Sequence, residues 1–422
     1  MTPEVQERIA QIRRGEVPDG YKRGKLGVMP TEWEIVSFRQ MFRPLNRRNA
    51  SGNANVLTIS AQQGLVSQNA FFKKNIASQN TENYFLLKRG DFAYNKSYSK
   101  GYPFGALKPL TLYESGIVSP LYICFSPSEE NPSPEYYAQY FDAGLMNGEI
   151  QAFAQEGARN HGLLNISIRD FFNSSLIFPT PEEQRRIAEI LSAQDNVIKL
   201  KERLLTEKWR QKKWLMQRLL TGKQRLPGFT GEWVTGLLGN LFSERVETNH
   251  ESLELLAITG SQGVIPRHYL ELKDNSSEDK SKYLKIHVGD IGYNTMRMWQ
   301  GVSAYSNYEG IVSPAYTILK PCKDIDARYF AYLFKMKHMI FLFYRFSQGL
   351  VDDTRNLKYT NFRKISALYP ADRAEQTAIA DILSVADREI DLLRASLEQE
   401  KRKKKALSQL LLTGIVRCIS NE

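Results

Sequence analysis

Residues 183–222 read EQRRIAEILSAQDNVIKLKERLLTEKWRQKKWLMQRLLTG, and this stretch decides the organisation of the chain because a second copy follows it. Residues 375–414 read EQTAIADILSVADREIDLLRASLEQEKRKKKALSQLLLTG and align with the first copy without a gap. Twenty of the forty positions are identical, whereas unrelated sequences of ordinary composition would share on the order of two or three. The chain is therefore a tandem duplication.

Both copies have the residue spacing of a long helix. Apolar residues recur every seven positions, with a lysine in the fourth place of each series: Leu191, Ile198, Leu205, Lys212 and Leu219, then Leu383, Ile390, Leu397, Lys404 and Leu411. Sustained heptads predict a coiled coil, and Gly222 and Gly414 are suitable residues to end the helices. We predict that two helices of about 60 Å pair as a rod between two globular parts. Two independent amphipathic helices, each packed on its own domain, are the alternative.

Shorter matches recur in the same order upstream of each helix. Glu-Trp stands at 32–33 and 232–233, Gly-Asp at 90–91 and 289–290, and Gly-Ile-Val-Ser-Pro at 116–120 and 310–314. Each Gly-Asp is followed, four residues after the Asp, by an asparagine, Asn95 or Asn294. The rest of each body differs, which indicates that the two bodies share a frame and recognise different targets.

The bodies have the composition of α+β domains in which strands predominate. Short β-rich runs such as 56–60, 84–88, 121–125 and 316–319 alternate with turn residues. Helices are expected at 134–144 and 327–334, and a short amino-terminal helix begins at Thr2-Pro3 and is closed by Gly15. We therefore divide the chain into an arm at 1–25, a first body at 26–178, a helical segment at 179–225, a second body at 226–369 and a second helical segment with the tail at 370–422.

Composition excludes several classes of protein. The chain has 422 residues, of which 42% are hydrophobic, which is typical of globular cores and excludes disorder throughout. No stretch approaches the roughly 18 apolar residues of a membrane helix, and residues 1–14 lack a signal-peptide apolar region. Three scattered Cys and five scattered His form no disulfide framework and no metal-binding motif. We expect a soluble intracellular protein without a metal site.

Positive charge is concentrated in the helical segments. Residues 199–225 carry ten Lys and Arg against Glu202 and Glu207, and residues 401–405 read KRKKK, so these segments hold +8 and +5 of the formal net charge of +11. A solvated helix face and a surface for an anionic partner such as nucleic acid explain this charge equally well.

Catalytic signatures are missing from the sequence. There is no nucleotide-binding GxxxxGK[ST] loop, no GxGxxG, no GxSxG and no Asn/Asp-Pro-Pro-Tyr/Phe tetrapeptide of base amino-group methylation. Glu271-Leu272-Lys273 matches only half of a nuclease motif, and Asp352-Asp353 reads as a turn. We predict that the chain is not an enzyme.

Polar loops at corresponding places in the two bodies are the candidate DNA contacts. Reading base edges requires Arg, Lys, Asn or Gln on loops that reach into a groove, whereas cations serve for phosphates. A polar surface turn is the plain alternative for each loop. In the first body the candidates are Arg47, Arg48, Gln62, Gln63, Asn95, Lys96, Ser97, Tyr98, Lys100, Arg159, Asn160 and His161. In the second body they are Ser261, Gln262, Asn294, Met296, Arg297, Trp299, Arg355 and Asn356.

Taken together, these features resemble the DNA-specificity subunit of type I restriction-modification systems over essentially the whole chain. The resemblance is carried by Pro30-Thr31-Glu32-Trp33, by Gly-Ile-Val-Ser-Pro in both bodies, and by Pro-x-x-x-Glu-Gln at 179–184, with a form one residue longer at 370–376. The basic heptad helices that end in Leu-Leu-Thr-Gly complete it. The second body departs from the pattern, since Gly231 stands near the place of Pro30.

The resemblance implies a fold and a set of partners. It implies two target recognition domains on double-stranded DNA, held apart by an antiparallel coiled coil of the two helices, in a prokaryotic cytoplasm. It also implies two adenine-N6 methyltransferase subunits that carry S-adenosylmethionine, and two motor-nuclease subunits that use ATP and Mg. No cofactor is expected on this chain. A coiled-coil adaptor that binds proteins and does not read DNA is the alternative function.

Overall fold

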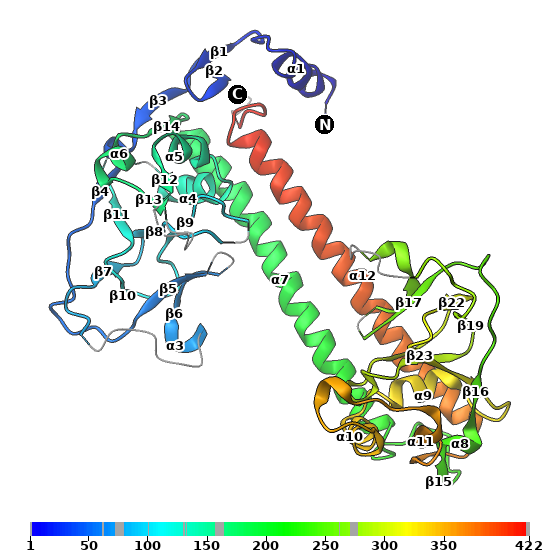
Figure 1. The fold of residues 1–422 in the computed structure, drawn as a ribbon. Coiled ribbons are helices and arrows are strands. Elements are labelled where there is room, and N and C mark those ends of the chain that lie inside the picture. Colours follow the sequence, from blue (N-terminus) through cyan, green and yellow to red (C-terminus); the bar gives the residue numbers. More distant parts are fainter. Residues whose placement is uncertain are drawn as a thin grey trace. The chain divides into compact units, whose positions relative to one another are not determined.

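The computed structural model describes residues 2–60, 63–71, 80–99, 101–129, 131, 133–156, 164–260, 262–270 and 277–418 (Figure 1). The chain forms two compact units, one of Met1–Leu200 with Leu397–Glu422 and the other of Lys201–Ser396. The two longest helices, α7 (Pro181–Leu219) and α12 (Arg373–Leu411), each contribute to both units. Each unit therefore contains one body, one part of α7 and one part of α12.

The first unit begins with helix α1 (Pro3–Arg13), as the Thr2-Pro3 signal predicts. Its strands are β1 (Tyr21–Gly24), β2 (Gly27–Pro30), β3 (Glu34–Ser37), β4 (Phe42–Pro44), β5 (Leu57–Ser60), β6 (Gly64–Ser67), β7 (Phe85–Lys88), β8 (Phe92–Asn95), β9 (Ala106–Pro109), β10 (Ser115–Val118), β11 (Ile123–Pro127), β12 (Gln155–Glu156), β13 (Leu164–Asn165) and β14 (Ser175–Phe178). Its other helices are α2 (Phe38–Met41), α3 (Gln68–Phe71), α4 (Pro134–Asp142), α5 (Asn147–Phe153) and α6 (Ile168–Asn173).

The second unit repeats this order without the arm. Its strands are β15 (Trp233–Leu237), β16 (Phe242–Arg245), β17 (Leu256–Thr259), β18 (Gly263–Pro266), β19 (Leu284–Ile286), β20 (Ile291–Asn294), β21 (Ser303–Tyr305), β22 (Gly310–Val312), β23 (Tyr316–Pro321) and β24 (Ser366–Pro370). Its helices are α8 (Leu238–Leu241), α9 (Ala327–Leu333), α10 (Lys337–Phe346) and α11 (Tyr359–Phe362), with 3-10 turns η1 (Arg267–Tyr269), η2 (Met298–Gln300) and η3 (Asp352–Thr354).

One sheet topology serves both bodies. The four-stranded sheet has the order β4-β11-β8-β9 in the first unit and β16-β23-β20-β21 in the second, with antiparallel pairing throughout. The third strand of each order, β8 or β20, directly follows a Gly-Asp and ends at Asn95 or Asn294. The α+β prediction with predominant strands is confirmed, and the repeated motifs occupy equivalent places in the two sheets.

Aromatic side chains form the core behind the first sheet. Phe38 is fully buried and packs its ring against Phe125 and Phe171, with centroids 5.1 and 4.7 Å apart. Each fully buried ring contributes roughly 1.5–3 kcal/mol through area removed from water. Residues of both long helices, including Ile187 and Leu411, belong to the same cluster. The helix ends are therefore part of the domain core.

The long helices pair antiparallel within each unit. In the second unit, contacts from Lys201, Lys208 and Lys212 of α7 go to Ser396, Glu389 and Asp387 of α12, so one helix descends as the other ascends. In the first unit, Gln194 of α7 donates to Glu400 of α12 at 2.8 Å. The heptad prediction is confirmed: positions of the predicted series are buried or half-buried, among them Leu191, Leu219, Leu383, Ile390 and Leu411.

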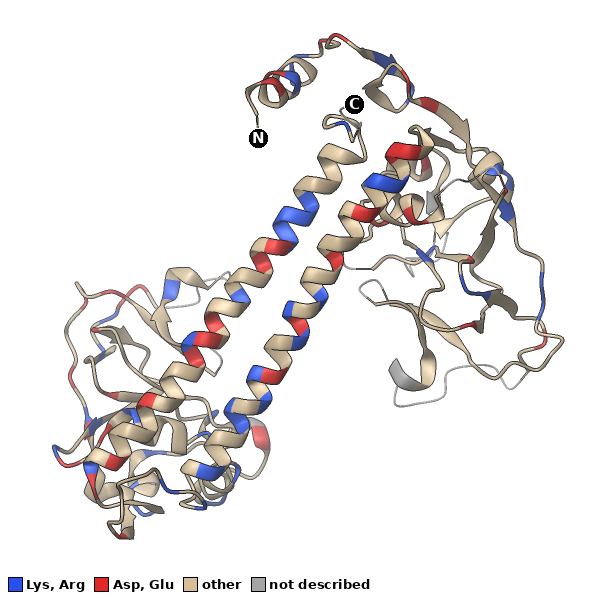
Figure 2. Ribbon diagram, turned by 180° about the vertical axis from the view of Figure 1, so that it is seen from behind, with Lys and Arg blue, Asp and Glu red and all other residues tan. Residues whose placement is uncertain are grey.

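Ion pairs form at the lysine positions of the heptad series, along the line of contact between α7 and α12. Figure 2 shows basic and acidic positions interspersed along both helices. Lys404 pairs with Asp195 at 2.6 Å in the first unit, and Lys212 pairs with Asp387 in the second. Lys404 and Lys212, the lysines of the two heptad series, are therefore paired within the fold.

In each unit a buried glutamate at the start of one long helix forms an ion pair with an arginine that follows the other long helix. Glu183, at the start of α7, is buried and accepts from Arg417 at 2.7 Å and from the indole N–H of Trp33 at 2.8 Å. Glu375, at the start of α12, is likewise buried and accepts from Arg225 at 2.6 Å. In each case the arginine stands three residues after the Leu-Thr-Gly of the other repeat. The tail is thus fastened to the first body, because Gly414 also lies against Trp33.

Candidate nucleic-acid interface

The loop that follows the Gly-Asp strand begins with the same turn in both bodies. The side-chain oxygen of Asn95 accepts from the backbone N–H of Ser97 at 3.1 Å, and that of Asn294 accepts from the N–H of Met296 at 3.0 Å. Such a turn fixes the direction in which the next residues leave the sheet. Each amide oxygen accepts one hydrogen bond in this turn, and the Nδ2 group of the same side chain donates in none of it.

A segment distant in sequence joins this loop in each body. The N–H of Leu164 donates to the carbonyl of Lys96 at 3.1 Å, and the N–H of Leu357 donates to the carbonyl of Thr295 at 2.8 Å. The structure thereby places Leu164, three residues after the predicted segment 155–161, against the loop that begins at Asn95, and Leu357, directly after the predicted segment 348–356, against the loop that begins at Asn294. Sequence order alone could not establish this adjacency, because it depends on the path of the intervening chain.

Strand pairing gives Asn356 a counterpart in the first body. Gln155 pairs with Asn165 across β12 and β13, and Gln348 pairs with Asn356 across a matching bridge. By strand pairing, the counterpart of Asn356 is therefore Asn165. The paired positions are ten residues apart in the first body and eight in the second. Asn165 is exposed and was missed as a candidate.

Matching hairpin turns present a glutamine in each body. Gln63 lies in the turn between β5 and β6, and Gln262 lies in the turn between β17 and β18. Both side chains are exposed, and both backbone N–H groups are held by a hydroxyl, of Ser60 or Thr259. The second hairpin lies beside the loop after β20, since a Cβ added to Gly260 would be 3.7 Å from Val302.

The Asp of each Gly-Asp binds an arginine of the same body. Arg47 pairs with Asp91, and Arg245 pairs with Asp290 at 2.7 Å. Asp91 is buried and also accepts from the backbone N–H of Lys88 at 2.6 Å. Arg47 therefore has a structural partner, and its predicted phosphate contact stays a prediction. Arg48 lies 3.9 Å above the ring of Phe85 and donates to a backbone carbonyl.

Aromatic and basic side chains meet in the second body. The ring of Trp299 lies 6.3 Å from that of Tyr344 on α10, and Arg355 lies 4.1 Å above the same tyrosine. Arg355 also donates to the Tyr344 hydroxyl at 2.9 Å and pairs with Asp352 at 2.9 Å. Tyr344 was not predicted, because it stands on a helix that looks like core in sequence.

A half-buried lysine holds the end of this loop. Lys335 donates to the carbonyls of Gly301 and Ser303 at 2.8 and 2.6 Å, where the loop returns to β21. Burial, together with the charge of nearby Lys212, lowers the pKa of Lys335 to about 8. Sequence gave no signal for this role, since the lysine reaches carbonyls more than 30 residues away.

The remaining predicted residues divide into two groups. Tyr98 is 64% exposed and Met296 is 47% exposed, so both are available to a ligand; Arg297 is exposed, and Lys96, Ser97 and Asn356 are half-buried. Six candidates lie outside the described residues: Gln62, Lys100, Arg159, Asn160, His161 and Ser261. The Glu-Leu-Lys at 271–273 also lies outside them.

Neither metal ligation nor membrane insertion finds support in the described part of the chain. Within these ranges no group of three or more His, Cys, Asp or Glu side chains is arranged to hold a metal ion. Among the described helices none is long and apolar enough to cross a membrane.

Comparison with known proteins identifies the fold. No protein-family model matches the chain. A chain from a structural study of complex assembly and conformational transition of the type I R-M system aligns with 92% of this chain and 99% of its own length, at 16% identity and a TM-score of 0.51. The S subunit of a type I restriction-modification system from M. genitalium aligns with 92% of this chain and 97% of its own length, at 12% identity and a TM-score of 0.55.

These likenesses define the class of fold. The chain is built like a type I restriction-modification S subunit along nearly its whole length, with duplicated α+β bodies and a long helix after each body. At these identities the likeness concerns the fold alone.

Proposed function

We propose that this chain is the DNA-specificity subunit of a type I restriction-modification complex. The observation that carries the proposal is one scaffold with two sets of loop residues. After equivalent strands the first body presents Lys96, Ser97 and Tyr98, and the second presents Met296 and Arg297. A conserved frame with changed surface side chains is suited to reading two different sequences.

The side chains on these loops suit the edges of base pairs. Arginine recognises guanine through two hydrogen bonds, and asparagine or glutamine recognises adenine in the same manner. Gln63 and Gln262 stand exposed on matching hairpin turns, and Arg297 stands exposed on the loop after β20. In this proposal Arg48 and other cations serve the phosphates, which position the protein without reading sequence.

Two DNA-recognition bodies on one chain would recognise a DNA site made of two separate half-sites. In our proposal the paired helices hold the readers apart, so the base pairs between the half-sites are spanned without direct contact. We expect the half-sites to lie about one turn of DNA apart, roughly 34 Å centre to centre, so that both face the same side of the duplex.

Catalysis belongs to partner subunits in this proposal. Two adenine-N6 methyltransferase subunits, which carry S-adenosylmethionine, would dock on the helices, and two motor-nuclease subunits would use ATP and Mg. Two features of this chain support the proposal. The sequence has no nucleotide-binding or methylation motif. The half of α7 in the second unit is positively charged, since residues 201–219 carry seven Lys and Arg against two Glu. The chain itself would be non-catalytic.

Mapping N6-methyladenine across the source genome, with and without this gene, tests the proposal. We expect methylation at one split motif to disappear when the gene is deleted and to return when it is restored. An unchanged map, together with unselective DNA binding by the complex of this chain with its methyltransferase, would favour a protein-binding adaptor. Methyl transfer by the isolated chain would contradict the non-catalytic role.

A further inference from the structure

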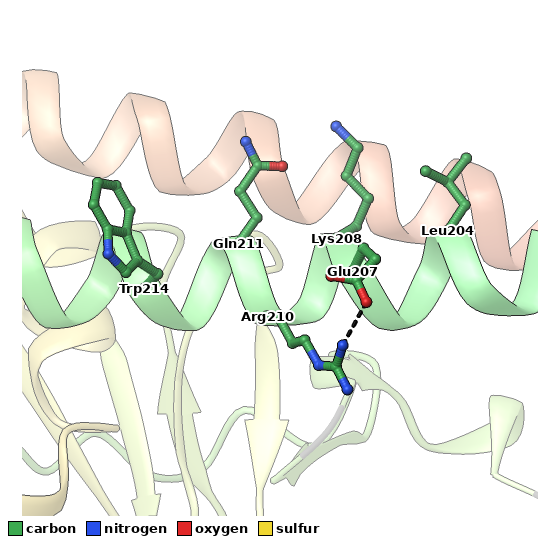
Figure 3. A pocket seen from close by; sticks show the side chains of 6 residues that line it. All are labelled: Leu204, Glu207, Lys208, Arg210, Gln211 and Trp214. Atoms are coloured by element: carbon green, nitrogen blue, oxygen red, sulfur yellow. Dashed lines mark hydrogen bonds and ion pairs between the residues drawn. The ribbon is translucent and has the colours of Figure 1, made fainter.

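The most exposed large apolar side chain in the described part of the chain lies in the second body, at Leu350. Its exposed fraction is 99%, and its neighbour Val351 is 59% exposed. Other exposed apolar side chains of the second unit are partly covered, such as Leu204 and Trp214, which line an open hollow on α7 and are each 48% exposed (Figure 3). Packing against the described residues therefore does not account for a leucine at position 350.

Leu350 lies near the tip of a hairpin that hydrogen bonds hold closed. Gln348 and Asn356 exchange both backbone hydrogen bonds at 2.8 Å, which closes the base of the hairpin. Gly349 has a φ of +124°, and a Cβ added there would lie 2.6 Å from the carbonyl oxygen of Thr354, so the turn requires glycine. This fixed turn presents Leu350 to solvent.

The hairpin is fastened to the loop after β20, which carries candidate DNA contacts. Leu357, the residue that follows the hairpin, donates its backbone N–H to the carbonyl of Thr295 at 2.8 Å. Arg355 lies 4.1 Å above the ring of Tyr344, and that ring lies 6.3 Å from the ring of Trp299. The hairpin and the loop therefore belong to one surface of the second body.

This surface combines apolar side chains with positive charge. Met296, on the loop after β20, is exposed, and its carbonyl accepts from the indole N–H of Trp299 at 2.9 Å, which holds the loop in place. Residues 337–364 carry six Lys and Arg against Asp352 and Asp353. Such charge suits the phosphates of DNA, and an exposed leucine beside it suits an apolar group that lies between the phosphates.

The major groove of DNA offers one such group. It is the C5-methyl of thymine, whereas the other groups that distinguish the bases there donate or accept hydrogen bonds. Leucine can do neither, so contact with this methyl group is the direct means by which it can distinguish one base pair from another. Arg297 on the neighbouring loop has the complementary chemistry, because arginine suits guanine.

We propose that Leu350 recognises a thymine in the half-site of the second body by packing against its C5-methyl group. The exposed Val351 enlarges the apolar surface on one side. This inference rests on the proposed function, and it assigns a base contact to a residue outside the predicted set. It follows that this half-site contains a T·A pair whose recognition depends on the methyl group.

Replacing single thymines by deoxyuridine tests the inference, because the exchange removes the methyl group and keeps every hydrogen-bonding group. The complex of the full-length chain with its methyltransferase subunit is titrated with duplexes that carry the mapped split site, each with one thymine exchanged. We expect one exchange in one half-site to weaken binding about fourfold, which corresponds to about 0.8 kcal/mol for one buried methyl group. In L350A the same exchange should leave the dissociation constant unchanged.

Two variants serve as matched controls. Val288 is exposed and directly precedes the Gly-Asp at the other end of β20, so V288A should keep the fourfold effect. L350M retains an apolar side chain of similar volume and should keep most of the effect. Thermal melting of L350A should match the natural chain because the substituted side chain is exposed, and this comparison separates lost recognition from misfolding.

Three outcomes would overturn the inference. One is the absence of a methyl effect at every thymine of the site in the natural complex. Another is a methyl effect that persists in L350A, including the case in which L350A weakens binding to all duplexes equally. The third is the absence of sequence-selective binding by the natural complex, which would overturn the proposed function as well, whereas selective binding without a methyl effect would overturn the inference alone.

Discussion

Lys404 of α12 pairs with Asp195 of α7 at 2.6 Å, and the same two repeat positions pair again, with the helices exchanged, as Lys212 and Asp387. Lys404 also lies 3.4 Å from Asp142 of the first body. The duplicated helix therefore completes itself: each copy supplies the lysine for the aspartate of the other. The fourth place of each heptad series, which would ordinarily be apolar, can hold a lysine because the other copy of the helix supplies an aspartate to pair with it.

Replacing Lys404 by methionine should weaken the first unit. We expect the free energy of unfolding to fall by about 1–3 kcal/mol, because charge-assisted hydrogen bonds are lost and Asp142 and Asp195 are left close together. In the double variant K404M/D195N the losses should fall short of additivity by about 1 kcal/mol. Urea denaturation measures this coupling, and K212M/D387N is the matched pair in the second unit. Strict additivity in both units would contradict the pairing.

Glu183 should make stability depend on acid pH. Burial alone would raise the pKa of its carboxyl, but hydrogen bonds from Arg417, Trp33 and Thr180 outweigh burial and hold the pKa below its ordinary value of 4.5. The unfolded chain then binds more protons in this range, so the stabilisation is complete above pH 4.5 and is lost as the pH falls through the lowered pKa. E183Q should lower stability at pH 7 by about 3 kcal/mol and flatten the acid profile.

The counterpart variant is the control for Glu183. Glu375 accepts from Arg225, whereas the indole N–H of Trp233 is buried without a partner in the described part of the chain. E375Q should therefore cost less than E183Q. Thermal melting across pH 3 to 7 compares them, and an equal loss in the two variants would show that the Trp33 hydrogen bond contributes little.

Lys335 should give the second unit a rising stability at alkaline pH. Its pKa is lowered to about 8 from an ordinary 10.5, so between these values the unfolded chain binds more protons than the folded one, and stability increases with pH. K335M should remove this rise and loosen the loop that carries Trp299. Urea midpoints at several pH values, followed by tryptophan fluorescence, measure the difference. Parallel profiles for the two proteins would contradict the role.

Arg297 should read one base pair of one half-site. R297A is expected to reduce discrimination at that position by about 1–3 kcal/mol if the arginine contacts guanine through two hydrogen bonds. Methylation or binding across a library of single-base variants locates the affected position. Substitution of exposed Lys323, in the turn after β23, is the control and should leave the preferences unchanged. A uniform loss across all sequences would instead identify Arg297 as a phosphate contact.

Seven residues inserted into each long helix should change the spacer and leave the half-sites unchanged. One heptad keeps the seam in register and adds about 10 Å of helix. That length corresponds to roughly three base pairs of DNA. Insertion after Leu200 and after Ser396 keeps each unit whole. A methylation map of the variant gives the new spacer, and altered half-sites with the original spacer would contradict the ruler role.

Sequence by itself determined the architecture of this protein. The duplicated forty residues predicted two long helices, and the recurring Gly-Asp and Gly-Ile-Val-Ser-Pro predicted equivalent places in two bodies, because heptads and repeats are properties of order along the chain. The start of α1 at Pro3 and the left-handed turns at Gly222 and Gly414 were predictable for the same reason. Local conformational preference acts over a few residues, and sequence records it directly.

Tertiary structure alone decided which distant residues meet. Only the fold placed Arg47 beside Asp91, and only strand pairing made Asn165 the counterpart of Asn356. Lys335 and Tyr344 gained their places beneath and beside the loop after β20 because helices α9 and α10 pack there. These contacts depend on how the intervening chain closes in space, and spacing along a sequence carries no record of that closure.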